Sequence, residues 1–136
     1  MCRNIALCKR SVEANVTVSV NLSRLEFRCC DIFKEIEDLT ARYRVPKELL
    51  HIEVTESVFM GGETVIWKTL KKFRAAGYEV WMDDFGSGYS SLNLLKDYKF
   101  DVLKIDMAFL SSPSKRARII LSSVVAMTKT IGGRSL

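Results

Sequence analysis

The sequence predicts an α/β protein built on a parallel sheet, and three observations support this. Short β-type runs alternate with helical patterns along the chain, which is typical of βαβ units. A polar residue stands at or near the carboxyl end of each run, where parallel folds bind their ligands. The 136 residues are 48% apolar and 27% charged, so the chain can bury an ordinary core and forms a single domain.

Four segments have the short length and the apolar, β-branched composition of strands. In the first of them valines alternate strictly with polar residues, which places the two sets on opposite faces of the sheet. The four segments are Val16–Asn21, Leu50–Val54, Glu79–Asp83 and Val102–Asp106. They predict four parallel strands in the order of the sequence.

A helical pattern follows each strand. Apolar residues at i, i+3, i+4 and i+7 predict a helix over 32–43, which Pro46 stops before the second strand. The same pattern predicts a helix from about Glu63 to Ala76, and Gly77 suits the left-handed position just after it. The remaining predicted helices are a shorter one over 91–98 and a longer one over about 114–131.

Four consecutive βα units fit two architectures. One is a small open α/β sheet, and the other is half of a (β/α)₈ barrel, which typically needs about 250 residues. Length favours the open sheet, and the strand-end residues favour the barrel. Because crossovers are right-handed, the helices should cover one face, whereas Ser19, Asn21 and Glu53 should face the barrel axis. The side chains expected to be buried on the helix-covered face are Val16, Val20, Ile52 and Ile105.

The distribution of charge argues against nucleic acid as a partner. The formal charge is +5, but residues 31–106 carry eleven bases and fourteen acids, and no basic cluster interleaves with aromatic residues. No DNA or RNA binding is therefore expected. No apolar run approaches the roughly 18 to 20 residues of a membrane span, and residues 1–10 lack a signal-peptide core. We expect no membrane segment and a cytoplasmic location.

The cysteines and the single histidine do not suggest a zinc site. No C-x-x-C pair is present, and His51 has no second ligand nearby, so His51 is expected at a strand edge. The cysteines, interpreted as free thiols of a reducing compartment, are Cys2, Cys8, Cys29 and Cys30.

Polar residues at the strand ends carry the chemistry: Asn21, Glu53, Asp83, Asp84 and Lys104. Converging carboxylates repel each other by roughly 4 kcal/mol per pair at 4 Å and an effective dielectric constant of 20, so a bound cation is expected. Oxygen ligands select Mg²⁺ or Mn²⁺, and adjacent aspartates can bridge two such ions. A neighbouring lysine suits a phosphate oxygen or an attacking water. The pattern indicates metal-assisted phosphoryl hydrolysis, with helix caps and ion pairs as the alternative.

Four segments of the chain closely resemble the EAL-domain family of cyclic di-GMP phosphodiesterases, in the family's order and spacing. They are Ser19–Ser23, Ile52–Ser57, Asp83–Leu92 and Leu103–Asp106. The resemblance covers nearly the whole chain and implies a modified (β/α)₈ barrel of the TIM type, of which about four consecutive parallel βα units are present. It also implies cyclic di-GMP as the ligand and Mg²⁺ or Mn²⁺ in a two-metal site.

The resemblance assigns a role to each strand-end residue. It implies that Asn21, Glu53 and Asp83 are metal ligands, and that Asp84 is a second-metal ligand or a base. By the same resemblance, Lys104 orients the attacking water. A further residue, Glu56, resembles the family's glutamate that braces the loop after the two aspartates. That loop is associated with dimerisation, so a homodimer through it is expected.

The chain departs from the family at both ends. The Glu-Ala-Leu segment should lie on an earlier strand, and the near match Glu13-Ala14-Asn15 abuts the first predicted strand instead. At residues 132–136 the family would begin a strand carrying another acidic ligand. Residues 1–136 therefore resemble a partial EAL-type domain, without the N-terminal Glu-Ala-Leu strand and the C-terminal strands. With an incomplete metal site, it is expected to be inactive alone.

Three interpretations follow. The chain is part of a phosphodiesterase domain, or a non-catalytic module that binds cyclic di-GMP or a protein, or an autonomous small α/β domain whose strand-end acids cap helices. An upstream Glu-Ala-Leu strand and a downstream acidic strand in the neighbouring coding sequence would favour the first. Absence of Mg²⁺ or Mn²⁺ binding would favour the third.

Overall fold

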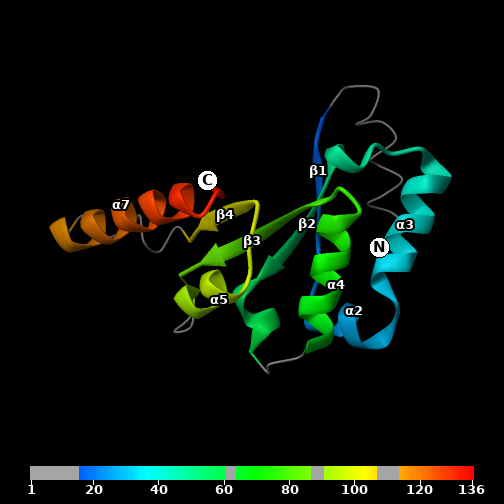
Figure 1. Cartoon of the computed structure of the whole chain (residues 1–136), viewed down its shortest axis with the longest axis horizontal. Helices are drawn as coiled ribbons and strands as arrows, with labels where there is room; N and C mark the ends of the chain where they lie inside the picture. Colours follow the sequence, from blue (N-terminus) through cyan, green and yellow to red (C-terminus); the bar gives the residue numbers. More distant parts are fainter. Residues whose placement is uncertain (1–15, 61–63, 87–90, 107–113) are drawn as a thin grey trace.

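A parallel sheet forms the centre of the molecule in the computed structural model, which describes residues 16–60, 64–86, 91–106 and 114–136 (Figure 1). All neighbouring strands run parallel, in the order β1-β2-β3-β4-β5. They are β1 (Val18–Asn21), β2 (Leu50–Thr55), β3 (Glu79–Phe85), β4 (Val102–Ile105) and β5 (Arg134–Ser135). The four predicted strands and their order are confirmed. A short fifth strand, which the sequence pattern did not reveal, is added next to β4.

Helices alternate with the strands along the sequence. Those described are α2 (Arg24–Cys29), α3 (Ile32–Tyr43), α4 (Thr64–Ala75), α5 (Ser91–Asp97) and α7 (Lys115–Thr130), with 3₁₀ turns η1 (Lys47–Leu49) and η2 (Glu56–Phe59). Helices α3 and α4 lie side by side (Figure 1), and Phe33 meets Phe73 between them. Gly77 has a φ of +100°, the left-handed conformation predicted after α4. The short α2, η1 and η2 were not predicted, because a few residues show no periodicity.

The helix-covered face of the sheet forms the core. Val20 pairs in register with Ile52, and both are buried as predicted. Val16 is 52% exposed, so its predicted burial is wrong: β1 begins only at Val18, and Val16 lies before the sheet. Ile105 is only partly buried, because it ends β4 next to the two-residue edge strand. Further core residues from the strands are Leu50, Val54, Val80, Met82 and Leu103.

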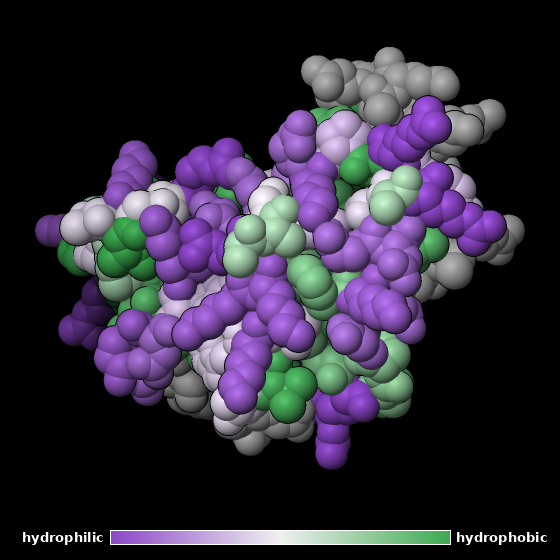
Figure 2. Space-filling view, turned by 45° about the vertical axis from the view of Figure 1, so that its right-hand side comes forward, coloured by the Kyte–Doolittle hydropathy of each residue, from purple (hydrophilic) through white to green (hydrophobic). Residues whose placement is uncertain are grey.

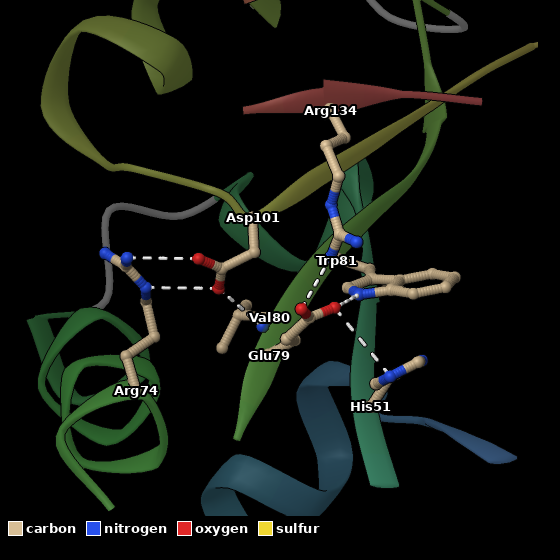
Figure 3. Close-up of polar contacts among 7 residues, drawn as sticks. All are labelled: His51, Arg74, Glu79, Val80, Trp81, Asp101 and Arg134. Atoms are coloured by element: carbon tan, nitrogen blue, oxygen red, sulfur yellow. Dashed lines mark hydrogen bonds and ion pairs between the residues drawn. The ribbon is translucent and has the colours of Figure 1, made fainter. Parts of the chain in front are cut away.

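One carboxylate holds the amino ends of β3 and β4 together (Figure 3). Asp101, just before β4, accepts hydrogen bonds from Nε and Nη2 of Arg74 on α4, at 3.2 and 3.1 Å. It also accepts one from the backbone N–H of Val80, at 2.9 Å. This bidentate ion pair ties a helix to two strands.

A second carboxylate at the same end links three strands, β2, β3 and β5 (Figure 3). Glu79 on β3 accepts from Nη2 of Arg134 on β5 at 2.5 Å and from Nε1 of Trp81 at 2.9 Å. The Trp81 ring stacks on His51 of β2, with centroids 4.2 Å apart. His51 is buried within the sheet, so its expected place at a strand edge is wrong.

The surface is largely polar. Hydrophilic side chains cover most of the face seen in Figure 2, with smaller hydrophobic areas between them. Within the described residues, no helix has both the length and the apolar character needed to cross a membrane.

Candidate functional site

Two polar side chains stand next to each other where β1 and β2 end. Asn21 pairs in register with Glu53, and partners in a parallel ladder point to the same face. Asn21 is exposed, whereas Glu53 is only 4% exposed. The backbone N–H of Leu22 donates to the carbonyl of Glu53 at 2.8 Å, which keeps the chain leaving β1 against β2. Both side chains therefore face away from the core, at the carboxyl end of the sheet.

A bulge in β3 brings two successive aspartates to the same side. Met82 pairs with Leu103 and Phe85 with Ile105, so β3 has one residue more than β4 between these pairs. Met82 and Phe85 are both buried, whereas Asp83 is partly exposed and Asp84 is exposed. Asp84 has a φ of +54°, and its N–H donates to Oδ1 of Asp83 at 3.1 Å. In a regular strand, one of these carboxylates would have pointed into the core.

Lys104 joins the strand ends. It lies on β4, yet its Nζ reaches across β3 to both carboxylate oxygens of Glu53, each at 3.3 Å. The same Nζ is 3.3 Å from Oδ1 of Asp83. Burial alone would lower the pKa of Lys104, but the carboxylates of Glu53 and Asp83 raise it above its ordinary value. The side chain therefore stays an ammonium ion between two carboxylates.

Glu56 follows β2 in the chain and is buried. It is the first residue of η2 and is 3% exposed. The loop that it is expected to brace runs through residues 87–90, which lie outside the described residues, as does the expected dimer contact. The bracing role of Glu56 therefore stays a prediction.

Arg24 is a residue at the site that the sequence did not single out. Its guanidinium, at the start of α2, donates to the carbonyl oxygens of Ser57 at 3.0 Å and Val58 at 3.4 Å, and to that of Met60. These carbonyls end η2, where helices leave acceptors without partners. Arg24 thus clamps the loop after β1 to the loop after β2. Its partners lie more than thirty residues away, so no local pattern could have revealed them.

The donors at the strand ends suit a hard cation. Among the described residues, no three Asp, Glu, His or Cys side chains gather closely enough to hold a metal ion. Glu53 and Asp83 nevertheless share one cation, the ammonium of Lys104, and their oxygens are the ligands that Mg²⁺ and Mn²⁺ prefer. The donor chemistry fits such an ion. Asn21, the register partner of Glu53, and Asp84, next to Asp83 in sequence, offer further oxygen donors.

Comparison with known proteins gives a consistent result. A family profile described as "EAL domain" matches residues 1–135. The chain is 34% identical over 115 residues to the signaling protein YkoW of Bacillus subtilis, covering 83% of this chain and 14% of that protein. It is 32% identical over 114 residues to the probable cyclic di-GMP phosphodiesterase PdeB of Escherichia coli, covering 84% and 22%. The chain thus spans a minor part of these relatives.

A solved structure extends the match to the fold. BlrP1 of Klebsiella pneumoniae, in a complex with manganese and cy-diGMP, aligns with a TM-score of 0.90 and 26% identity, over 98% of this chain and 35% of that one. A second complex of BlrP1 contains calcium with cy-diGMP. The five parallel strands described above match part of the barrel of such domains.

Proposed function

This chain belongs to the EAL domain family, and we propose that it forms the central part of a metal-dependent phosphodiesterase domain that hydrolyses cyclic di-GMP to the linear dinucleotide. One observation carries the proposal: Glu53, Asp83 and Lys104, from three neighbouring strands, converge within 3.3 Å at the carboxyl end of the sheet. Parallel α/β folds bind substrates at this end.

The polar side chains at the carboxyl ends of the strands form what we call the rim: Asn21, Glu53, Asp83, Asp84 and Lys104. Each of them has a role in the proposed reaction. Asn21, Glu53 and Asp83 would hold Mg²⁺ or Mn²⁺, which activates water and offsets phosphate charge when bound. Asp84 would hold a second ion or accept a proton, which its exposed position in the bulge permits. Lys104 would donate to the attacking water and hold it in line with the phosphorus. Because three strands position these groups, the water would be oriented before the reaction begins.

The relatives support the substrate and the metal. PdeB is named a probable cyclic di-GMP phosphodiesterase, and BlrP1 holds manganese with cy-diGMP. The chain spans 22% of PdeB and 35% of BlrP1, and its described acidic residues form no complete metal site. We therefore propose that the 136-residue chain by itself does not turn over cyclic di-GMP, and that further ligands come from additional barrel strands.

Two other parts of the proposal concern assembly and location. Glu56 would brace the loop after Asp84, and a second copy of the chain would dock on that loop. The exposed free thiols of Cys29 and Cys30 support a reducing, cytoplasmic location.

A non-catalytic role is the second candidate. Lys104 already offsets the charges of Glu53 and Asp83, so the rim needs no metal ion to be stable. A module with such a rim could bind cyclic di-GMP through Lys104 and the exposed Asn21 without hydrolysing it.

A chimera tests the two candidates. The aligned segment of PdeB would be replaced by this chain, and formation of linear dinucleotide would be measured with Mn²⁺, with PdeB itself as the positive control. We expect turnover in the chimera and its loss in the Lys104→Ala variant. A folded chimera that binds cyclic di-GMP without turnover would contradict the phosphodiesterase proposal and support the binding module.

A further inference from the structure

The position of Lys104 is unusual for a group whose expected task is to hold a water. Its Nζ is equidistant, at 3.3 Å, from Oε1 and Oε2 of Glu53 and from Oδ1 of Asp83. Three oxygens from two strands therefore surround one ammonium group. This is the arrangement that the same oxygens would offer to a metal ion.

The electrostatics of the rim explain why a cation belongs there. The Glu53 side chain is only 5% exposed, so water cannot offset its charge, and a buried carboxylate without a partner is costly. Asp83 brings a second negative charge towards the same point from β3. The chain must supply a positive charge while no metal is bound, and Lys104 does so from β4.

A lysine and a divalent ion cannot both occupy this point. Like charges a few ångströms apart repel strongly at a partly buried site, and an ion held by the same three oxygens would have to take the place of the ammonium group. Lys104 can leave, because its side chain is 35% exposed and has four flexible methylene groups. Glu53 has no such freedom, since it is buried on the interior strand β2, between β1 and β3.

We propose that Lys104 is a built-in counter-cation that occupies the metal position between Glu53 and Asp83, so that a divalent ion binds only by displacing it. The inference rests on the proposed function, because it concerns control of the same rim. It makes metal affinity a competition: the lysine stabilises the metal-free rim and weakens metal binding. Once displaced from the carboxylates, the ammonium group is free to donate to a water or a phosphate oxygen. Metal binding would therefore make Lys104 available as a hydrogen-bond donor.

The experiment is a titration of the 136-residue chain with Mn²⁺ alone, followed by calorimetry or by loss of the free-ion paramagnetic signal. The variant is Lys104→Met, which keeps the length of the side chain and removes its charge. The control is Lys99→Met, an exposed lysine before β4, which makes the same change in net charge. We expect Lys104→Met to bind Mn²⁺ at least about 10-fold more tightly than the wild type, and Lys99→Met to be unchanged. Equal or weaker binding by Lys104→Met, or no binding by either protein, would overturn the proposal.

A second measurement uses the unmodified chain, so it decides the matter even where Lys104→Met fails to fold. Reductive methylation of lysines would be followed by mass spectrometry, with and without Mn²⁺. We expect Mn²⁺ to increase the labelling of Lys104 at least several-fold relative to Lys99, because the displaced amine is more accessible. Unchanged or reduced labelling at a saturating Mn²⁺ concentration would contradict displacement. Neither measurement involves cyclic di-GMP, so an inactive chimera would count against the proposed function and not against this competition.

Discussion

The two ends of the same parallel strands are built differently. At the amino ends, Asp101 receives three hydrogen bonds of 2.9 to 3.2 Å from Arg74 and the N–H of Val80. At the carboxyl ends, one ammonium group, that of Lys104, is shared by Glu53 and Asp83 at 3.3 Å from each. The two ends differ in how donors are shared, because Asp101 has three donor groups of its own whereas Glu53 and Asp83 share one ammonium group. The amino end satisfies its charges within the chain, whereas the carboxyl end keeps donors and acceptors available to a ligand.

The contrast indicates that the amino ends of the strands serve stability and the carboxyl ends serve function. Arg74 presents a planar fork to the carboxylate of Asp101, which fixes its geometry. Lys104 carries a point charge on a flexible stem, which can move when a ligand arrives. Substitutions at the amino end should therefore act on the free energy of unfolding, and substitutions at the carboxyl end on binding and turnover.

The largest expected effect is on turnover, from Asp83→Asn in the PdeB chimera. An amide is a poorer metal ligand than a carboxylate, so we expect a loss of at least about 100-fold, since even residues behind metal ligands cost 10- to 100-fold. The free energy of unfolding, measured in urea, should change by no more than about 0.5 kcal/mol. Retained turnover, or a large loss of stability, would break the distinction between the two ends.

The largest expected effect on stability comes from Asp101→Ala. The substitution leaves the Val80 N–H and the Arg74 guanidinium without their acceptor, at a cost of about 2 to 3 kcal/mol in the free energy of unfolding. Asp101→Asn keeps an acceptor for Val80 and should cost about half as much. Urea unfolding measures both variants. A loss below about 0.5 kcal/mol in Asp101→Ala would show that the amino end contributes no more than an exposed surface ion pair.

Much of this architecture was predictable from local patterns. Alternation in Val18–Asn21 and the apolar run of β2 predicted the strands, because apolar side chains are usually buried and polar ones exposed. The convergence of Glu53, Asp83 and Lys104 followed from one rule, that parallel strands end at a common edge.

The rest depended on contacts that no local pattern encodes. The bulge at Asp84 changes the register between β3 and β4, and register is a relation between two strands. Arg24 meets carbonyls more than thirty residues away, and Lys104 reaches over β3 to Glu53. The burial of Val16 was predicted wrongly because alternation continues beyond the point where β1 finds a partner.

A smaller effect is expected from Arg24→Met, which removes the clamp between the loops after β1 and β2. The carbonyls of Ser57 and Met60 lose a charged donor, so η2 should open more often. We expect faster hydrogen exchange in peptides covering residues 56–60, and a loss of about 1 kcal/mol in the free energy of unfolding. Arg42→Met, an exposed arginine on α3, is the matched control. Equal hydrogen-exchange rates over residues 56–60 in both variants would show that the opening of η2 does not depend on Arg24.

The smallest expected effect is a dependence of stability on pH at the amino end, near the start of β3. Glu37 on α3 accepts from Nζ of Lys47 at 2.7 Å and from the hydroxyl of Tyr78 at 2.6 Å. These two donors hold the pKa of Glu37 below its ordinary value. Because the pKa is lower in the folded chain, the ionised carboxylate stabilises the fold above the ordinary carboxyl range, and this contribution is lost as the pH falls through the folded value.

Glu37→Gln should therefore lower the free energy of unfolding at pH 7 by no more than about 1 kcal/mol, since the pair is about one-third exposed. The difference from the wild type should shrink as the pH falls below 4.5, the ordinary value for this carboxyl group. Urea unfolding at a series of pH values between about 2 and 7 measures this, with Asp38→Asn on the exposed side of α3 as the control. A difference that stays constant over this range would contradict a contribution from the charge of Glu37, because such a contribution must disappear as the carboxylate is protonated.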